Sequence, residues 1–234
     1  MRSYKAILLD LDDTLLGNSM ERFLPAYFGL LGTFAARHMP TERFLGELMA
    51  CTRAAMTDLD PATTNRDVFW RVFRERNTDL CVDSLERELV GFYQNEFPRL
   101  REHTQPRPAA VELVKACQAA GLQVVVATNP IFPQLAIEHR LAWAGLGQLR
   151  FDLITTYDNM HSTKPHLSYY QEILAWLDCP PEAAVMVGDD WGNDIEPALQ
   201  LGMGAWWIGS GDPRPGLLGQ GGLEDLLGLF RTSL

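Results

Sequence analysis

The chain has 234 residues, of which 47% are hydrophobic, and its formal net charge at pH 7 is −10. This length suits one large domain or one domain with an insert, and the acidic balance argues against nonspecific binding to nucleic acid. No run of 18 apolar residues occurs, so no membrane-spanning helix is expected. The four cysteines form no CxxC pair and no metal-like spacing, which favours reduced thiols. We expect a cytoplasmic protein without a signal peptide, either a monomer or a homodimer.

The first predicted element is a short buried strand over residues 6–9, and it ends directly in the acidic segment Asp10-Leu11-Asp12-Asp13-Thr14. Asp10 and Asp12 therefore leave the tip of this strand two residues apart. Burying two carboxylates without a partner is costly, and a divalent cation such as Mg²⁺ would supply a partner. A solvated acidic turn is the alternative explanation, because such turns are common after strands.

A helical pattern replaces the strand pattern after residue 18 and continues for about 80 residues. It predicts a four-helix insert between the first strand and the rest of the sheet. Asn65 is a plausible N-cap for the third helix. We place the outgoing hinge near Leu16 to Ser19 and the return hinge in the proline-bearing connector from Arg101 to Pro108. The four helices are expected at 20–37, from 41 onward, at 66–76 and at 83–97.

From Pro108 onward the pattern alternates between helices and short apolar strands. Such alternation predicts a parallel sheet with right-handed crossovers. The tail is predicted to form a glycine-rich turn over 209–222 and then a packing helix over 223–230. The predicted strands are 122–127, 151–155, 184–188 and 205–208, and the predicted helices are 108–120, 132–144, 166–177 and 193–201.

Polar side chains stand at the boundaries of these predicted elements, and in open α/β sheets ligands bind outside the carboxyl ends of the strands. Taken singly, several have a plainer explanation. Thr128 could be a cap after a strand, Lys164 a solvated surface charge, and Asp190 and Asp194 an acidic helix start that the helix dipole favours. Together we expect them to converge with Asp10. The residues concerned are Thr128, Asn129, Lys164, Asp189, Asp190 and Asp194.

In this order the motifs resemble those of the haloacid dehalogenase-like (HAD) hydrolase superfamily, and within it the phosphatases. The family pattern has DxDx[TV] after the first strand, Ser or Thr after the second, a Lys further on, and an acidic GDxxxD-type motif after the fourth. The resemblance spans about Lys5 to Ile208. It implies an α/β fold, with a Rossmann-like parallel sheet core over 1–17 and 105–234 and a helical cap of the C1 type over 18–104. The matching residues are Asp10, Asp12, Thr128, Lys164, Asp189 and Asp194.

By this resemblance Asp10 is the nucleophile that forms an aspartyl-phosphate, and Asp12 is the general acid and base. The resembling dehalogenases lack the second Asp, so its presence favours phosphoryl transfer. Asp10, the backbone carbonyl of Asp12 and the side chain of Asp189 would hold Mg²⁺.

The remaining residues would serve the phosphoryl group and the metal. The Thr128 hydroxyl and the backbone N–H of Asn129 would donate to phosphoryl oxygens, and Lys164 would offset their charge. Asp190 and Asp194 would orient a metal-bound water or Lys164.

These residues predict a Mg²⁺-dependent phosphomonoester hydrolase that acts on a small phosphorylated metabolite, with neither nucleic acid nor a membrane as partner. Two alternatives stay open: a phosphomutase of the same fold, which would return the phosphoryl group to its substrate, and a catalytically silent phosphate-binding protein. A signalling receiver domain also combines an acidic cluster with Thr and Lys. Its phosphorylated Asp follows a later strand, however, and it lacks a long helical insert.

Overall fold

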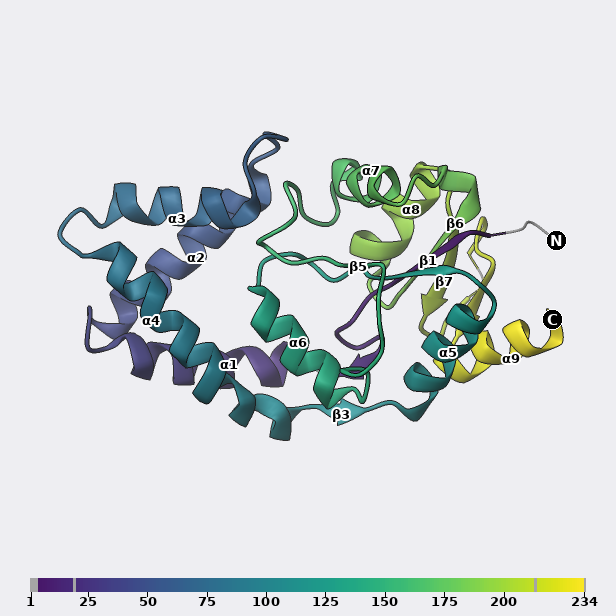
Figure 1. Ribbon diagram of the computed structural model, residues 1–234, viewed down its shortest axis with the longest axis horizontal. Coiled ribbons are helices and arrows are strands. Elements are labelled where there is room, and N and C mark those ends of the chain that lie inside the picture. Colours follow the sequence, from purple (N-terminus) through teal and green to yellow (C-terminus); the bar gives the residue numbers. More distant parts are fainter. Residues whose placement is uncertain (1–3, 19, 213, 234) are drawn as a thin grey trace.

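The computed structural model describes residues 4–18, 20–212 and 214–233, and Figure 1 shows their arrangement. Six strands form one sheet in the order β5-β4-β1-β6-β7-β8, and every neighbouring pair is parallel. This confirms the predicted parallel α/β core. Within the described residues, no helix is long and apolar enough to cross a bilayer. The strands are β1 (Ala6–Leu9), β4 (Gln123–Val126), β5 (Leu153–Ile154), β6 (Ala184–Gly188), β7 (Gly204–Ile208) and β8 (Gly219–Gly221).

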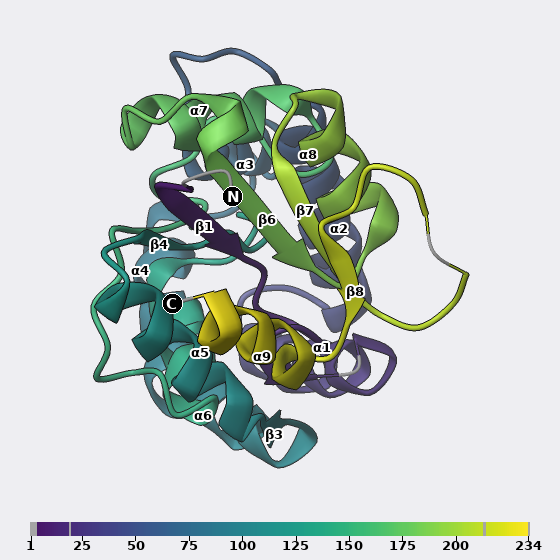
Figure 2. The same ribbon diagram turned by 90° about the vertical axis from the view of Figure 1, so that its right-hand side faces the viewer.

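Strand β1 lies in the interior of the sheet, and its side chains alternate between the two faces. Ile7 and Leu9 belong to the core shared with α5, α6 and α9, whereas Ala6 and Leu8 belong to the core shared with α7 and α8. Figure 2 shows α5 and α9 on one side of the sheet and α7 and α8 on the other. Cover on both faces explains the unbroken apolar run before Asp10. The helices of this core are α5 (Pro108–Ala119), α6 (Gln134–Trp143), α7 (Leu167–Trp176), η2 (Pro181–Ala183), η3 (Trp191–Ile195), α8 (Glu196–Gln200) and α9 (Leu223–Ser233).

The helical insert, by which we mean α1 to α4 with the 3₁₀ helix η1, lies to one side of the sheet beyond α6 (Figure 1). Where the chain leaves the core and returns to it, β2 (Leu16–Gly17) pairs antiparallel with β3 (Gln105–Pro106). Both strands fall within the predicted hinges, of which Ser19 lies outside the described residues. The insert comprises α1 (Met20–Ala35), α2 (Thr41–Thr57), α3 (Asn65–Arg76), α4 (Val82–Asn95) and η1 (Phe97–His103).

The prediction that Asn65 caps α3 is wrong by one residue. Thr64 is the N-cap, and its side-chain oxygen accepts a hydrogen bond from the Asp67 N–H at 3.2 Å. Asn65 is buried, and its side-chain amide donates to the carbonyl oxygens of Pro130 and Ser162, both at 3.2 Å. Asn65 therefore joins the insert to two loops of the core, a role that depends on tertiary contacts and not on local capping rules.

Two further predictions differ from the structure in the last third of the chain. The predicted glycine-rich turn contains β8, where a Cβ at Gly219 would overlap the ring of Trp206. The glycine allows close packing there, but it also removes the apolar alternation that identifies a strand. The predicted helix over 193–201 is divided into the π-helical turn η3 and α8, and Pro197 lies in the first turn of α8, where proline is tolerated.

Candidate active site

Asp10 stands at the end of an interior strand, and predicted site residues follow both neighbouring strands. The Asp10 N–H donates to the Val187 carbonyl of β6 at 2.9 Å, which aligns the ends of β1 and β6. Thr128 follows β4 and Asp189 follows β6, and these two strands flank β1. Because the three strands are parallel, their carboxyl ends meet at one edge of the sheet. The structure thus brings Asp10, Thr128 and Asp189 to the same edge.

Lys164 is a buried cation at this edge. Its Nζ donates to Asp10 Oδ1 at 2.7 Å and to Asp194 Oδ1 at 2.6 Å, and the side chains of Lys164 and Asp194 are each 2% exposed. Burial lowers the pKa of Lys164, but the negative charges of Asp10 and Asp194 outweigh burial and raise this pKa well above its ordinary value. Lys164 is therefore protonated at neutral pH and holds the two carboxylates together.

Asp10, Asp189 and Asp194 form an acidic cluster, in which one oxygen of each residue lies within 4.8 Å of the others. Burial, together with the charge of Asp10, raises the pKa of Asp189 to about 6, although the Thr14 hydroxyl donates to Asp189 Oδ1 at 3.2 Å. Burial also raises the pKa of Asp10 and of Asp194 despite the contact with Lys164. One ammonium group does not offset three neighbouring carboxylates. The cluster therefore fits a divalent cation with oxygen ligands, such as Mg²⁺.

Asp190 and Asp194 follow the same strand but have different surroundings. Asp194 belongs to the acidic cluster, and its close approach depends on Gly188, where a Cβ would overlap the Asp194 carboxylate. Asp190 is exposed, and its Oδ1 accepts hydrogen bonds from the Gly192 N–H at 2.9 Å and the Asn193 N–H at 3.0 Å. Asp190 thus caps η3, as an acidic residue at a helix start is expected to do.

Asp12 is not a member of the acidic cluster and has a cation of its own. Arg140 Nη1 donates to Asp12 Oδ2 at 2.5 Å, and Asn18 Nδ2 donates to Asp12 Oδ1 at 2.8 Å. Arg140 is 1% exposed, and its guanidinium lies 4.5 Å from the centre of the Phe132 ring. Among the described residues, its Nη2 has no hydrogen-bond partner. Arg140 and Asn18 together fix the orientation of the Asp12 carboxylate.

The motifs do not identify Arg140, although the sequence contains a signal for it. Ala136, Ile137 and Leu141 mark the buried face of α6, and Arg140 lies on the same face by helical spacing. An arginine on an apolar stripe needs a partner, because a buried unpaired charge is costly. That partner, Asp12, is 128 residues away in the sequence, so no local pattern identifies it.

In the loop after β4, the Thr128 carbonyl accepts hydrogen bonds from the Thr155 hydroxyl at 2.7 Å and the Tyr169 hydroxyl at 2.9 Å, which position this loop. Asn129 Oδ1 is buried without a hydrogen-bond partner among the described residues.

A cavity of about 500 Å³ lies between this edge of the sheet and the helical insert. Every site residue predicted from the sequence lines the cavity: Asp10, Asp12, Thr128, Asn129, Lys164, Asp189, Asp190 and Asp194.

Residues 4–202 match the model of the haloacid dehalogenase-like hydrolase family, which is most of the chain. The chain belongs to this family. The match confirms the family that the motifs resemble, and it makes the protein a HAD hydrolase with an α/β core.

The relatives of this HAD hydrolase carry several names. It is 34% identical to the haloacid dehalogenase-like hydrolase domain-containing protein 3 of Xenopus laevis over 101 residues, which are 43% of this chain and 40% of that protein. It is 26% identical to the pyrophosphatase PpaX of Bacillus cereus over 184 residues, which are 79% of this chain and 74% of that protein. A 2-haloacid dehalogenase from Pseudomonas syringae pv. Tomato DC3000 shares the fold at a TM-score of 0.63, with 23% identity and coverage of 99% of this chain and 100% of that one.

Proposed function

We propose that this HAD hydrolase is a Mg²⁺-dependent phosphomonoester hydrolase that acts on a small phosphorylated metabolite through an aspartyl-phosphate. The observation that carries the proposal is the arrangement of Asp10 and Asp12 in one cavity. Lys164 holds the Asp10 carboxylate in the acidic cluster, whereas Asp12 has a separate partner, Arg140. This arrangement supplies a nucleophile and a distinct proton donor and acceptor on one wall of a cavity.

The proposed metal ligands are the side chains of Asp10 and Asp189 and the backbone carbonyl of Asp12, as expected from the motifs. Asp194 lies in the acidic cluster with Asp10 and Asp189 and would orient Lys164 or a metal-bound water. Bound there, Mg²⁺ would offset the charge on the phosphoryl oxygens during transfer.

The proposed chemistry has two steps. First, an oxygen of Asp10 forms a bond to phosphorus while the bond between phosphorus and the ester oxygen breaks, and Asp12 donates a proton to that leaving oxygen. Second, Asp12 removes a proton from water as the water oxygen bonds to phosphorus, and the bond between phosphorus and Asp10 breaks. Phosphate leaves and Asp10 is restored. Lys164 would offset the negative charge of Asp10 before transfer and that of the phosphoryl oxygens afterwards, and Thr128 and Asn129 would donate to the phosphoryl oxygens.

We further propose that the insert acts as a cap domain over residues 18–104, and that residues 1–17 and 105–234 form the core domain. Two observations support this division: the chain crosses between the two parts at the β2–β3 pair, and residues of the insert line the cavity above the acidic cluster. Closure of such a cap would exclude water during the first step and select the leaving group.

Phosphate release from p-nitrophenyl phosphate is expected to require Mg²⁺. EDTA should abolish the reaction and added Mg²⁺ should restore it. One lysine does not neutralise the three carboxylates of the acidic cluster, so the cluster needs a second cation. Mg²⁺ should also raise the midpoint of thermal unfolding in the absence of substrate, since it binds the folded cluster only. Turnover unaffected by EDTA would contradict the metal-dependent mechanism. Monophosphate conversion that requires a bisphosphate activator would instead indicate the phosphomutase.

Arg140→Met is expected to lower kcat for p-nitrophenyl phosphate by about 10- to 100-fold, because Asp12 would lose the contact that orients it. KM should change little, since Arg140 acts through Asp12 and not on the ester. Arg140→Lys should recover part of kcat, as it restores the charge without the planar fork. Arg150→Met, at an exposed arginine beyond the same helix, is the matched control. An unchanged kcat in Arg140→Met would exclude this positioning role.

A further inference from the structure

The part of the cavity that faces away from the acidic cluster is built from apolar side chains. Helices of the insert and the loop before α6 contribute them, and many are aromatic. At about 500 Å³ the cavity falls within the usual range for small-molecule sites, ~300–1,000 Å³. Representative lining residues are Leu24 and Phe28 of α1, Met49 of α2, Phe69 of α3, Val90 of α4 and Phe132 before α6.

Positive charge in the described lining of the cavity is confined to Lys164 and Arg140. Both belong to the core, and both are paired with carboxylates, Lys164 with Asp10 and Asp194 and Arg140 with Asp12. The insert therefore presents no cation to the part of a substrate that extends beyond the phosphoryl group.

Two arginines of the insert pair with a residue of the cavity wall and do not themselves line the cavity. Arg66 and Arg74 both pair with Glu86, the one acidic residue that the described insert contributes to the cavity lining.

Of the polar groups that remain, the hydroxyls of Tyr27 and Tyr93 bond to each other at 2.9 Å. Among the described residues, the buried lining atoms without a partner are Trp70 Nε1 in the insert and Asn129 Oδ1 and Arg140 Nη2 in the core. The insert thus offers few hydrogen-bonding groups to a polar leaving group.

This lining discriminates among leaving groups. A second phosphate or a carboxylate on the substrate would enter an apolar space without a counter-ion, at a high desolvation cost. The several hydroxyls of a sugar would lose more hydrogen bonds to water than these few groups replace. A hydrocarbon group would instead gain by leaving water.

We infer that the substrate is a phosphate monoester of an uncharged apolar alcohol, whose hydrocarbon group occupies the space between the insert and Phe132. This inference rests on the proposed function, since it names the leaving group of that reaction. Pyrophosphate is then a poor substrate of this chain, although the pyrophosphatase PpaX is among its relatives.

The test compares ethyl, butyl and hexyl phosphate with pyrophosphate and phosphoglycolate, in Mg²⁺, by phosphate release. We expect kcat/KM to rise on the order of 100-fold from ethyl to hexyl phosphate, as four methylene groups leave water. Pyrophosphate and phosphoglycolate should be poorer substrates than butyl phosphate. The matching alkylphosphonates, which are not hydrolysed, provide a second measurement by calorimetry, and their Kd should fall as the chain lengthens.

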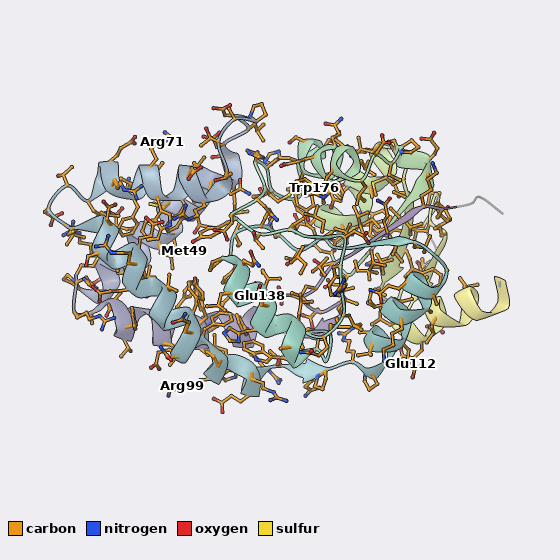
Figure 3. The ribbon with its side chains drawn as sticks, in the orientation of Figure 1. Met49, Arg71, Arg99, Glu112, Glu138 and Trp176 are labelled. Atoms are coloured by element: carbon orange, nitrogen blue, oxygen red, sulfur yellow. The ribbon has the colours of Figure 1, made fainter. Side chains whose placement is uncertain are left out.

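A variant pair locates the effect in the cavity. Val90 and Leu59 both lie in the insert, at 51% and 54% exposure, so that aspartate is tolerated at either position. Val90 lines the cavity and Leu59 does not. Val90→Asp should reduce the hexyl to ethyl ratio of kcat/KM by about 10-fold, and Leu59→Asp should leave this ratio unchanged. Met49 of α2, labelled in Figure 3, is another half-exposed residue that lines the cavity.

The outcomes separate the inference from the proposed function. Hydrolysis that depends on Asp10 but shows no dependence on chain length, with an equally flat series of phosphonate Kd values, would overturn the inference alone. Absence of hydrolysis for every ester would overturn the proposed function. In that case the phosphonates decide the preference of the cavity, since a Kd that falls with chain length supports it and a constant Kd overturns it.

Discussion

Asp10→Asn is expected to reduce phosphate release from p-nitrophenyl phosphate by about 10³-fold or more. The amide keeps the size of the side chain but is a poor nucleophile, so the aspartyl-phosphate cannot form. The fold should remain intact, because Lys164 keeps its contact with Asp194 at 2.6 Å. Burial raises the pKa of Asp10, which means that its charge is disfavoured in the folded state, and the substitution removes that charge. The free energy of unfolding should therefore not fall.

The measurement pairs steady-state kinetics with urea denaturation. Asp152→Asn is the matched control, since Asp152 is an exposed acid beside β5 whose hydrogen bond to the Val124 N–H an asparagine oxygen can also accept. It should retain wild-type turnover. Turnover that survives in Asp10→Asn would show that another residue is the nucleophile.

Lys164→Met is expected to lower the free energy of unfolding by about 3–5 kcal/mol, because it leaves buried carboxylates without their cation. Asp10 and Asp194 would then stand near Asp189 with no positive charge among the described residues that contact them in the structure. The loss should be largest in EDTA, and Mg²⁺ should recover more stability in this variant than in the wild type, since the cation would be the remaining counter-charge.

Urea denaturation with and without Mg²⁺ measures both effects. Lys115→Met, at an exposed lysine of α5, controls for the loss of a surface charge and should change stability little. Equal stability of Lys164→Met and the wild type in EDTA would mean that the acidic cluster does not depend on Lys164.

The helical insert gives the cavity an apolar lining that the motifs do not describe. Asp10, Thr128 and Asp189 stand just beyond strand ends, where we propose that the phosphoryl group binds, whereas the apolar part of the cavity comes largely from α1 to α4. A fold by itself does not determine the substrate, which depends on the residues that line the site. The proposed preference for apolar esters therefore depends on the packing of the insert and not on the motifs.

Local patterns were sufficient to predict most of the core. An apolar run ending in Asp10, a second ending in Thr128 and a third ending in Asp189 are each strand signals with a polar end, and alternation with helices predicts parallel strands. Parallel strands place those ends at one edge, so the convergence of these residues follows from the sequence alone. Strand β8 was missed, because its glycines carry no apolar alternation.

The tertiary structure decided the contacts between residues that are distant in the sequence. Arg140 is 128 positions from Asp12 and yet holds its carboxylate, and Asn65 bonds to loops of the core instead of capping its own helix. Asp190 and Asp194 both follow β6 in the sequence. Only Asp194 packs against Gly188, contacts Lys164 and belongs to the acidic cluster. Periodicity and capping rules describe neighbours along the chain. Which charge is paired, and which wall of a cavity is apolar, depends on how separate elements pack.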